Sequence, residues 1–346
     1  MKMKEKGITI HDVAKRAEVS ITTVSRYMNG SFDNMSEGTR QRLEQVIREL
    51  DYRPNNLARG LKSQNSRTIG CVVADMANPF SALLIKGINK VCREQGYQVL
   101  ILDADNDGAL EKDAYKSLLN NPVEGIIANT TGKADAELLA AAGRLPLVLA
   151  DREIESSGQI DSVVSDNWEA TYHTVQYLLE KGYERIGFFS PPTEHISTRS
   201  ARLDAFRQAL KELRGEDTGA SVFLCEGGGP QVLSEKLRQF AAQVGDVPAA
   251  IFSVNGEMTR QILHEMRSQG LKLSPSLGLC SFDDWDWLAL VGSGITTVAT
   301  DTYEMGVKSA ALLFEKMAGR EKLPVRRIEM KNVLVERSST CRVNDE

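Results

Sequence analysis

The sequence predicts two different folds in one chain: an all-α helix-turn-helix head, followed by an α/β core of two doubly wound parallel sheets. Three short helical patterns within the first sixty residues predict the head. From residue 67 onwards, apolar runs suited to buried parallel strands alternate with amphipathic helical patterns. About 280 residues are too many for one such sheet. We therefore expect two lobes that face each other, with a binding crevice at the carboxyl ends of the strands.

The composition is that of a globular protein, with 42% hydrophobic and 26% charged residues. No apolar run reaches the ~18 residues of a membrane span, so we expect no membrane partner. The first residues include lysines but no apolar stretch follows them, so we expect no secretory signal. The five cysteines are scattered and form no C-x-x-C pair, which indicates reduced thiols in a cytoplasmic protein.

Charge is unevenly distributed along the chain. The formal net charge is −5, whereas residues 1–62 hold 12 Lys and Arg against 8 Asp and Glu. A basic head on an acidic body indicates one end that binds a polyanion and one end with another task. Chance clustering of charged residues in a short segment would produce the same counts. The sequence motifs are therefore needed to distinguish a polyanion-binding head from chance.

The helices of the head begin at recognisable capping residues. Thr9 is the expected N-cap of the first helix, with Asp12 three residues later as in a capping box. Ser20 is expected to open a second, short helix that ends near residue 28. Ser36 is expected to cap a third helix, whose apolar face consists of Leu43, Val46, Ile47 and Leu50.

The second helix has the pattern of a DNA-reading helix. Val24 and Tyr27 point toward a core, and Ile21 and Thr22 lie at the N-terminal end, which meets base edges in a major groove. The face predicted to contact DNA carries Ile21, Thr22, Ser25 and Arg26. The alternative is a generic three-helix cap with a solvated polar face.

In the core, the expected strands cover 69–74, 99–102, 125–128, 147–150, 186–189, 249–253 and 277–281. The expected helices cover 80–95, 109–120, 134–142, 168–181, 200–213, 231–243, 256–268 and 302–318. Asp75 and Phe80 follow the first strand and Asp151 follows the fourth, so all three are expected on the wall of the crevice.

Several segments resemble the lactose-repressor/galactose-repressor (LacI/GalR) family. The head contains ITIHDVAKRAEVSITTVSRYMNG and then SEGTRQRLEQVIRELDYRPNNLARGLKS. In the body, comparable family motifs match DMANPF (75–80), DNWEATYHTVQYLLEKGYERIGFFS (166–190), RLDAF (202–206) and FDDWDW (282–287). The resemblance covers essentially the whole chain in the same order of parts, so it is more specific than any single motif.

The resemblance implies an operator-reading domain at 1–54, a hinge helix and linker at 55–66, and a core like a periplasmic sugar-binding protein at 67–346. We expect the first lobe at about 67–165 plus 295–324 and the second at about 166–294 plus 325–346. Proteins of this family bind palindromic operators as homodimers; a tetramer stays open as an alternative. No cofactor, metal or catalytic residue is expected.

The resemblance also assigns the DNA contacts. Ile21, Thr22 and Arg26 match base-contacting positions, and the hinge segment contributes Asn55, Ala58 and Leu61. Leu61 matches a leucine that wedges into the minor groove at the centre of the operator. A helix of about seven residues is marginal in water, and Gly60 weakens it by about another 1 kcal/mol. We therefore expect residues 55–62 to fold only on DNA; a plain linker is the alternative.

The predicted effector-binding residues are Asp75, Phe80, Asp151, Arg202, Asn255, Asp283 and Trp285. Arg202, Asn255 and Asp283 match effector-contacting positions of the family. Carboxylates accept hydrogen bonds from hydroxyl groups, a guanidinium binds hydroxyls or a carboxylate, and an aromatic ring covers the apolar side of a sugar. Each has a plainer alternative: a surface ion pair for Arg202, a turn for Asp283, and core packing for Phe80.

Two features depart from the family pattern. Gly256 stands where members commonly have an aspartate, and FDDWDW contains two additional tryptophans. For Trp285, stacking in the cleft and packing in the core are equally open. The additional Arg152 beside Asp151 favours a sugar or a sugar acid as the effector.

Together these features predict a transcriptional repressor of carbohydrate-utilisation genes, controlled by that effector. One alternative is a doubly wound enzyme, but no G-x-G-x-x-G follows the first strand and no G-x-S-x-G occurs. The other alternative is a sugar-binding protein without direct gene control, which would have no use for the basic head.

Overall fold

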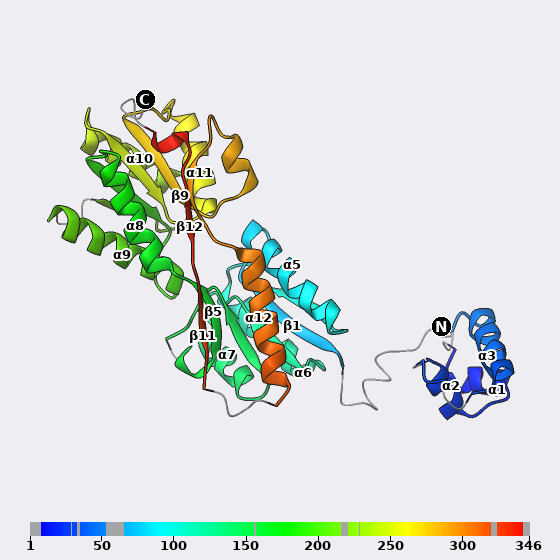
Figure 1. The fold of residues 1–346 in the computed structure, drawn as a ribbon. Helices are drawn as coiled ribbons and strands as arrows, with labels where there is room; N and C mark the ends of the chain where they lie inside the picture. The colour runs from blue at the N-terminus through cyan, green and yellow to red at the C-terminus, as the bar shows by residue number, and fades with distance from the viewer. Residues whose placement is uncertain are drawn as a thin grey trace, which may run out of the picture. The chain divides into compact units, whose positions relative to one another are not determined.

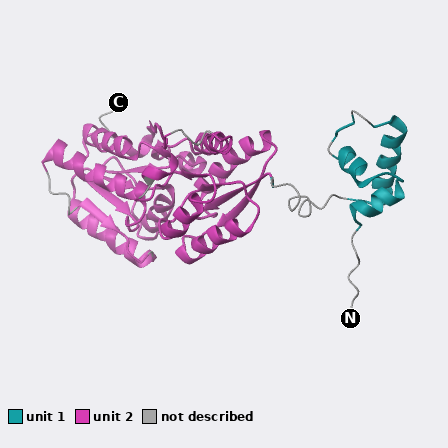
Figure 2. Cartoon of the chain, turned by 90° about the horizontal axis from the view of Figure 1, so that it is seen from below, with its two compact units in different colours: residues 1–66 teal, residues 67–346 magenta. Residues whose placement is uncertain are grey.

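The computed structural model describes residues 8–28, 30–32, 35–52, 66–155, 157–215, 221–227, 229–319 and 324–341. The chain forms two compact units, residues 1–66 and 67–346 (Figure 2). The predicted hinge contacts Asn55, Ala58 and Leu61 lie outside the described residues, so their roles stay predictions.

The first unit is a three-helix domain of α1 (Ile10–Arg16), α2 (Ile21–Met28) and α3 (Glu37–Glu49). The predicted caps are present: the Thr9 amide donates to Asp12 Oδ2 at 2.8 Å, and Ser36 Oγ accepts from the Thr39 amide at 3.3 Å. The core of the domain consists of Val13, Ala14, Ala17, Val24, Leu43 and Val46. The predicted apolar faces therefore bury against one another, which confirms the all-α head.

The second unit contains two six-stranded sheets, one in each lobe (Figure 1). The first sheet is entirely parallel, in the order β11-β5-β4-β3-β1-β2. Its strands are β1 (Thr68–Val73), β2 (Gln98–Asp103), β3 (Gly125–Ala128), β4 (Leu147–Ala150), β5 (Asp161–Ser165) and β11 (Arg327–Met330). One face packs on α5 (Pro79–Glu94) and α12 (Thr302–Met317), the other on α6 (Gly108–Asn120) and α7 (Asp135–Ala142).

The second sheet has the order β12-β10-β9-β8-β6-β7 and is parallel except for β12. Its strands are β6 (Arg185–Ser190), β7 (Val222–Leu224), β8 (Ala249–Ser253), β9 (Leu277–Phe282), β10 (Thr296–Ala299) and β12 (Val333–Val335). Its helices are α8 (Asn167–Glu180), α9 (Ser197–Arg214), α10 (Pro230–Val244) and α11 (Gly256–Ser268). Aromatic rings dominate the core of this lobe, including Phe188, Phe189, Phe206, Phe223, Phe240, Phe252 and Phe282. The two-lobed α/β prediction is confirmed.

Two predicted lobe boundaries differ from the structure. We expected residues from 295 in the first lobe and residues from 325 in the second. Instead, β10 pairs with β9 in the second lobe and β11 pairs with β5 in the first. The chain therefore passes between the lobes at 165–167, 299–302 and 330–333, and the last passage joins β11 to β12 (Figure 1).

No described helix combines the length and the apolar character that a membrane crossing requires. All five cysteines are free; four are buried and Cys341 is exposed.

Candidate functional site

Helix α2 presents the face that the sequence assigns to DNA. Ile21 is 40% exposed, and Thr22 and Arg26 are exposed as well, whereas Ser25 is half-buried. Val24, on the opposite side, is fully buried and anchors the helix in the domain core. The predicted base-reading side chains are therefore accessible on one face of a helix that packing holds in place.

In the second unit, the carboxyl ends of strands from both sheets open into one cavity. Six of the seven predicted effector-binding residues line it: Asp75, Phe80, Asp151, Arg202, Asn255 and Asp283. Asp75 and Asp151 follow β1 and β4 of the first lobe, and Asn255 and Asp283 follow β8 and β9 of the second. This is the position in which open α/β folds bind their ligands.

Arg202, on α9, is buried at 6% exposure and held from three directions. Its Nε donates to Asn167 Oδ1 at 2.8 Å, and its Nη1 donates to the Val254 carbonyl at 2.6 Å. The guanidinium lies 3.7 Å from the centre of the Phe282 ring, a cation–π contact. Burial lowers the pKa of Arg202, while Asp283 and Asp151 oppose that shift. The arginine is thus fixed before any ligand arrives.

Asp151 and Arg152 form a charged pair on the wall of the first lobe. Arg152 Nε lies 3.8 Å from Asp151 Oδ2, and Arg152 Nη1 donates to the Thr130 carbonyl at 2.9 Å. Asn129 Nδ2 donates to Asp151 Oδ2 at 3.4 Å and to the Ala150 carbonyl at 3.1 Å. Burial raises the pKa of the Asp151 carboxyl, although Arg152 and Arg202 act against that shift.

Asn255 and Asp283 connect two loops of the second lobe. Asn255 caps α11, because its Oδ1 accepts from the Met258 amide at 2.8 Å. Asp283 Oδ2 accepts from the Gly256 amide at 3.0 Å. Both residues therefore have local structural partners as well as a place on the cavity wall.

Trp285 is the one predicted effector residue that is not on the cavity wall in the described part of the chain. It is 8% exposed and belongs to the core of the second lobe. A Cβ atom at Gly256 would lie 2.9 Å from the Trp285 ring, so the indole occupies the space next to this glycine. Packing, the second of the two alternatives, is what the structure shows. The two departures from the family pattern are thus spatial neighbours that accommodate each other.

The two lobes touch each other. A Cβ atom at Gly132, in the first lobe, would lie 1.8 Å from the carbonyl oxygen of His195 in the second. The Glu153 amide also donates to Ser197 Oγ across the lobes at 2.9 Å. These contacts describe a core whose lobes are closed on each other.

Sequence comparison extends over both units. Residues 66–333 match the family model "Periplasmic binding proteins and sugar binding domain of LacI family", and residues 9–55 match "Bacterial regulatory proteins, lacI family". The transcriptional regulator PtxS of Pseudomonas plecoglossicida is 36% identical over 96% of both chains.

The chain belongs to the LacI family. It is a helix-turn-helix transcriptional regulator, as the motifs predicted. The regulator KdgR of Bacillus subtilis is 33% identical over 98% of this chain and 100% of its own. A lac repressor dimer bound to operator and the anti-inducer ONPF superposes with a TM-score of 0.81 at 23% identity. That match covers 97% of this chain and 100% of the other, and it confirms the fold.

Sequence reasoning missed several residues of this LacI-family cavity. Asn106 and Asn129 follow β2 and β3, at the same sheet edge as the predicted aspartates, so strand position could have identified them. Arg199 precedes Arg202 by three residues on α9, a spacing that places both on one face of a helix. Glu257 and Gln261 also lie on the wall, from the first turns of α11.

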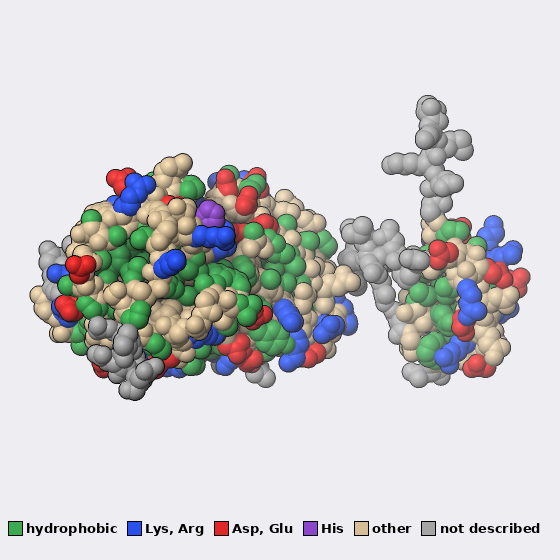
Figure 3. All heavy atoms as spheres, turned by 90° about the horizontal axis from the view of Figure 1, so that it is seen from above, with side chains coloured by type: hydrophobic (Ala, Val, Ile, Leu, Met, Phe, Trp, Pro, Cys, Tyr) green, Lys and Arg blue, Asp and Glu red, His purple; other side chains and the backbone are tan. Residues whose placement is uncertain are grey.

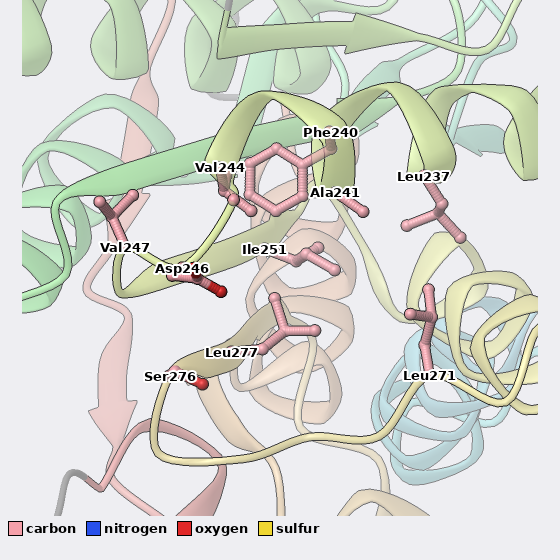
Figure 4. Close-up of a pocket in the computed structure, with 11 residues that line it drawn as sticks. Leu237, Phe240, Ala241, Val244, Asp246, Val247, Ile251, Leu271, Ser276 and Leu277 are labelled. Carbon is pink, nitrogen blue, oxygen red and sulfur yellow. The ribbon is translucent and has the colours of Figure 1, made fainter.

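The regulator has a second hollow, which is apolar. Leu237, Phe240 and Val244 of α10 lie across it from Ile251 and Leu277 (Figure 4). Leu277 begins β9, so this hollow lies at the amino ends of the strands, away from the cleft. Its side chains offer few polar groups for a hydroxylated ligand.

Proposed function

We propose that this regulator represses carbohydrate-utilisation genes by binding a palindromic operator as a homodimer. A small sugar or sugar acid in the cleft between the lobes sets the operator affinity. We assign operator reading to residues 1–54, the hinge to 55–66 and effector binding to 67–346. The regulator acts by binding alone, in the cytoplasm where its operator is.

The observation that carries this proposal is the cleft itself. Arg202, Asp151 and Asp283 converge there from both lobes, with Asp75 and the ring of Phe80 on the same wall. Carboxylates and guanidinium groups beside an aromatic ring suit a ligand rich in hydroxyl groups. A solved relative, a CelR–cellobiose complex, is 25% identical with a TM-score of 0.69 and covers 96% of this chain and 99% of its own.

The exposed face of α2 favours gene control over sugar binding alone. Ile21, Thr22 and Arg26 have no packing task in the head, and side chains of these types contact base edges and thymine methyl groups. A face of the core over which hydrophobic side chains gather supports a homodimer (Figure 3).

Coupling is proposed to run through the hinge. In this proposal, ligand-dependent closure of the lobes changes the distance between the two hinge segments of a dimer. That distance in turn determines whether residues 55–62 can fold in the minor groove. A coupling of 1–3 kcal/mol corresponds to roughly 5- to 150-fold control of operator affinity.

The test begins with selection of operator sequences from randomised DNA duplexes by the full-length protein. Mobility shift on the selected palindrome is then repeated with single sugars and sugar acids. At least one ligand should change the operator Kd by roughly 5-fold or more. If every ligand that binds the core leaves the operator Kd unchanged, the proposed control of operator affinity by the cleft is refuted. Failure to select any palindrome would refute operator reading.

A further inference from the structure

The cleft contains three arginines, and one of them lacks a counter-ion. Asp283 and Asp151 interact electrostatically with Arg202, and Arg152 lies beside Asp151. Arg199 differs from both. Its Nη1 donates to the Pro192 carbonyl at 3.0 Å, and among the described residues the charges that act on it are those of Arg152 and Arg202, with no carboxylate.

The position of Arg199 is electrostatically unfavourable. Burial, together with the neighbouring Arg152 and Arg202, lowers its pKa to about 10. Arg199 is half-buried, and a partly desolvated cation beside two other cations is unfavourable. Arg199 lines the cavity from the first turn of α9, so an anion bound there would be its missing partner.

Two further groups favour an anion at the same place. Helix α9 begins without a side-chain cap in the described structure, since its N-cap residue is Ile196. Its first amides and the helix dipole therefore favour a negative group, and Thr198 of this turn lines the cavity. The Nε of Arg152 is buried and has no hydrogen-bond acceptor among the described residues.

The wall of the cavity also carries carboxylates. Asp75, Asp151 and Asp283 accept hydrogen bonds, which suits hydroxyl groups and repels a second anionic group. A ligand that satisfies both the arginines and the carboxylates carries several hydroxyl groups and one negative charge.

We propose that the effector is a sugar acid, and that Arg199, together with Arg152, binds its carboxylate and excludes the neutral sugar. This inference rests on the proposed function, in which the cleft binds a sugar or a sugar acid. In this proposal, Arg199 determines the preference for an acid over the neutral sugar. A single carboxylate matches the charge of Arg199, whereas a phosphate would bring more negative charge toward the aspartates.

The test uses the full-length protein and matched ligand sets. Each set contains a six-carbon sugar, its aldonate and uronate, the keto derivatives of these acids, and its 6-phosphate. Thermal shift identifies the ligands that bind, and calorimetry gives their Kd. The variants are Arg199→Gln, Arg199→Lys and, as the matched control, Arg207→Gln on the exposed side of the same helix.

We expect one sugar acid to bind at least roughly tenfold more tightly than its neutral counterpart. Arg199→Gln should weaken that acid roughly 10- to 100-fold and remove the preference for it. Arg199→Lys should restore part of the preference because it keeps the charge, and Arg207→Gln should leave it unchanged.

Three results would overturn the assignment: a neutral sugar that binds as tightly as any acid, a sugar phosphate that binds best, or equal losses for acid and neutral sugar in Arg199→Gln. If a neutral sugar alone binds and shifts operator affinity, the proposed function stands and the role of Arg199 fails. If no sugar or sugar acid binds, the proposed function itself fails.

Discussion

Asp151 is a buried carboxyl group among charges of both signs. It is 8% exposed, with Arg152 Nε 3.8 Å away. Burial raises its pKa more than the arginines lower it, and Asp283 adds to the rise. The ionised carboxylate is therefore less favourable in the folded protein than in the unfolded chain. The ionised Asp151 carboxylate therefore lowers the stability of the folded protein.

This cost predicts a pH-dependent effect of Asp151→Asn. Above the raised pKa the folded protein holds a charge that the amide variant lacks, so the variant should have the higher Tm at pH 8. As the pH falls through the raised pKa, wild type takes up a proton on folding and gains stability. Below the unfolded-state pKa of about 3.9 the difference should vanish.

Thermal denaturation of the ligand-free protein between pH 4 and pH 8 checks this, with the exposed Asp204→Asn as the control. A variant that is less stable than wild type at pH 8, with a gap that closes on acidification, would show that the arginines stabilise the carboxylate more than burial penalises it.

Gly256 and Trp285 make a second prediction for single residues. Because a Cβ atom at Gly256 would lie 2.9 Å from the indole, Gly256→Asp should lower the free energy of unfolding by about 1–3 kcal/mol. In the Trp285→Leu background, Gly256→Asp should lower the free energy of unfolding by less, because the smaller leucine leaves room for the new side chain. Urea denaturation of the two single variants and the double variant measures the coupling. Strict additivity would mean that the two residues do not share this space.

At the scale of residues, the sequence identified six cavity residues because each follows a strand or matches a family motif. Strand order alone could have added Asn106 and Asn129. The lack of a counter-ion at Arg199 could not be predicted, because it depends on which side chains of both lobes come close in space. The packing of Trp285 against Gly256 could not be predicted from the sequence either, because the two residues are 29 positions apart.

At the scale of elements, the strands that were predicted are short runs of buried apolar residues, such as β4. Two of the strands that were missed begin with polar residues. β5 begins at Asp161, whose Oδ1 accepts from the Arg326 amide at 2.7 Å, and β10 begins with Thr296 and Thr297. Their pairings with β11 and β12 join segments far apart in the chain, so no local pattern reveals these pairings. That is also why the lobe boundaries near 295 and 325 were misplaced.

The contact between the lobes predicts the effect of Gly132→Ala. Gly132 has φ +73°, and its Cβ would collide with the His195 carbonyl. The closed arrangement of the lobes should therefore be blocked, and effector affinity should fall by more than roughly tenfold. Gly143→Ala in the same lobe, where a Cβ finds ordinary contacts at 3.6 Å, is the control. Calorimetry with the identified effector measures both variants, and unchanged affinity in Gly132→Ala would show that the ligand does not need the closed lobes.

At the scale of the whole molecule, operator binding is predicted to depend on Leu61. Its insertion into the minor groove would bury a leucine side chain, worth about 1.5–3 kcal/mol. Leu61→Ala should weaken operator binding roughly 10- to 100-fold and reduce the DNA bend. Mobility shift on circularly permuted operator fragments measures both quantities, and a variant with unchanged affinity and bend would refute the wedge.

The most direct test of the account is the ratio of operator Kd values with and without saturating effector, measured by fluorescence anisotropy for wild type and Arg202→Lys. Arg202 is held by Asn167 and Val254 at the centre of the cleft, so replacing it should disturb the cleft itself. In wild type, the effector should change the operator Kd by roughly 5- to 150-fold. In Arg202→Lys, the two Kd values should be nearly equal. A wild-type ratio of one, or a ratio that Arg202→Lys leaves unchanged, would contradict it.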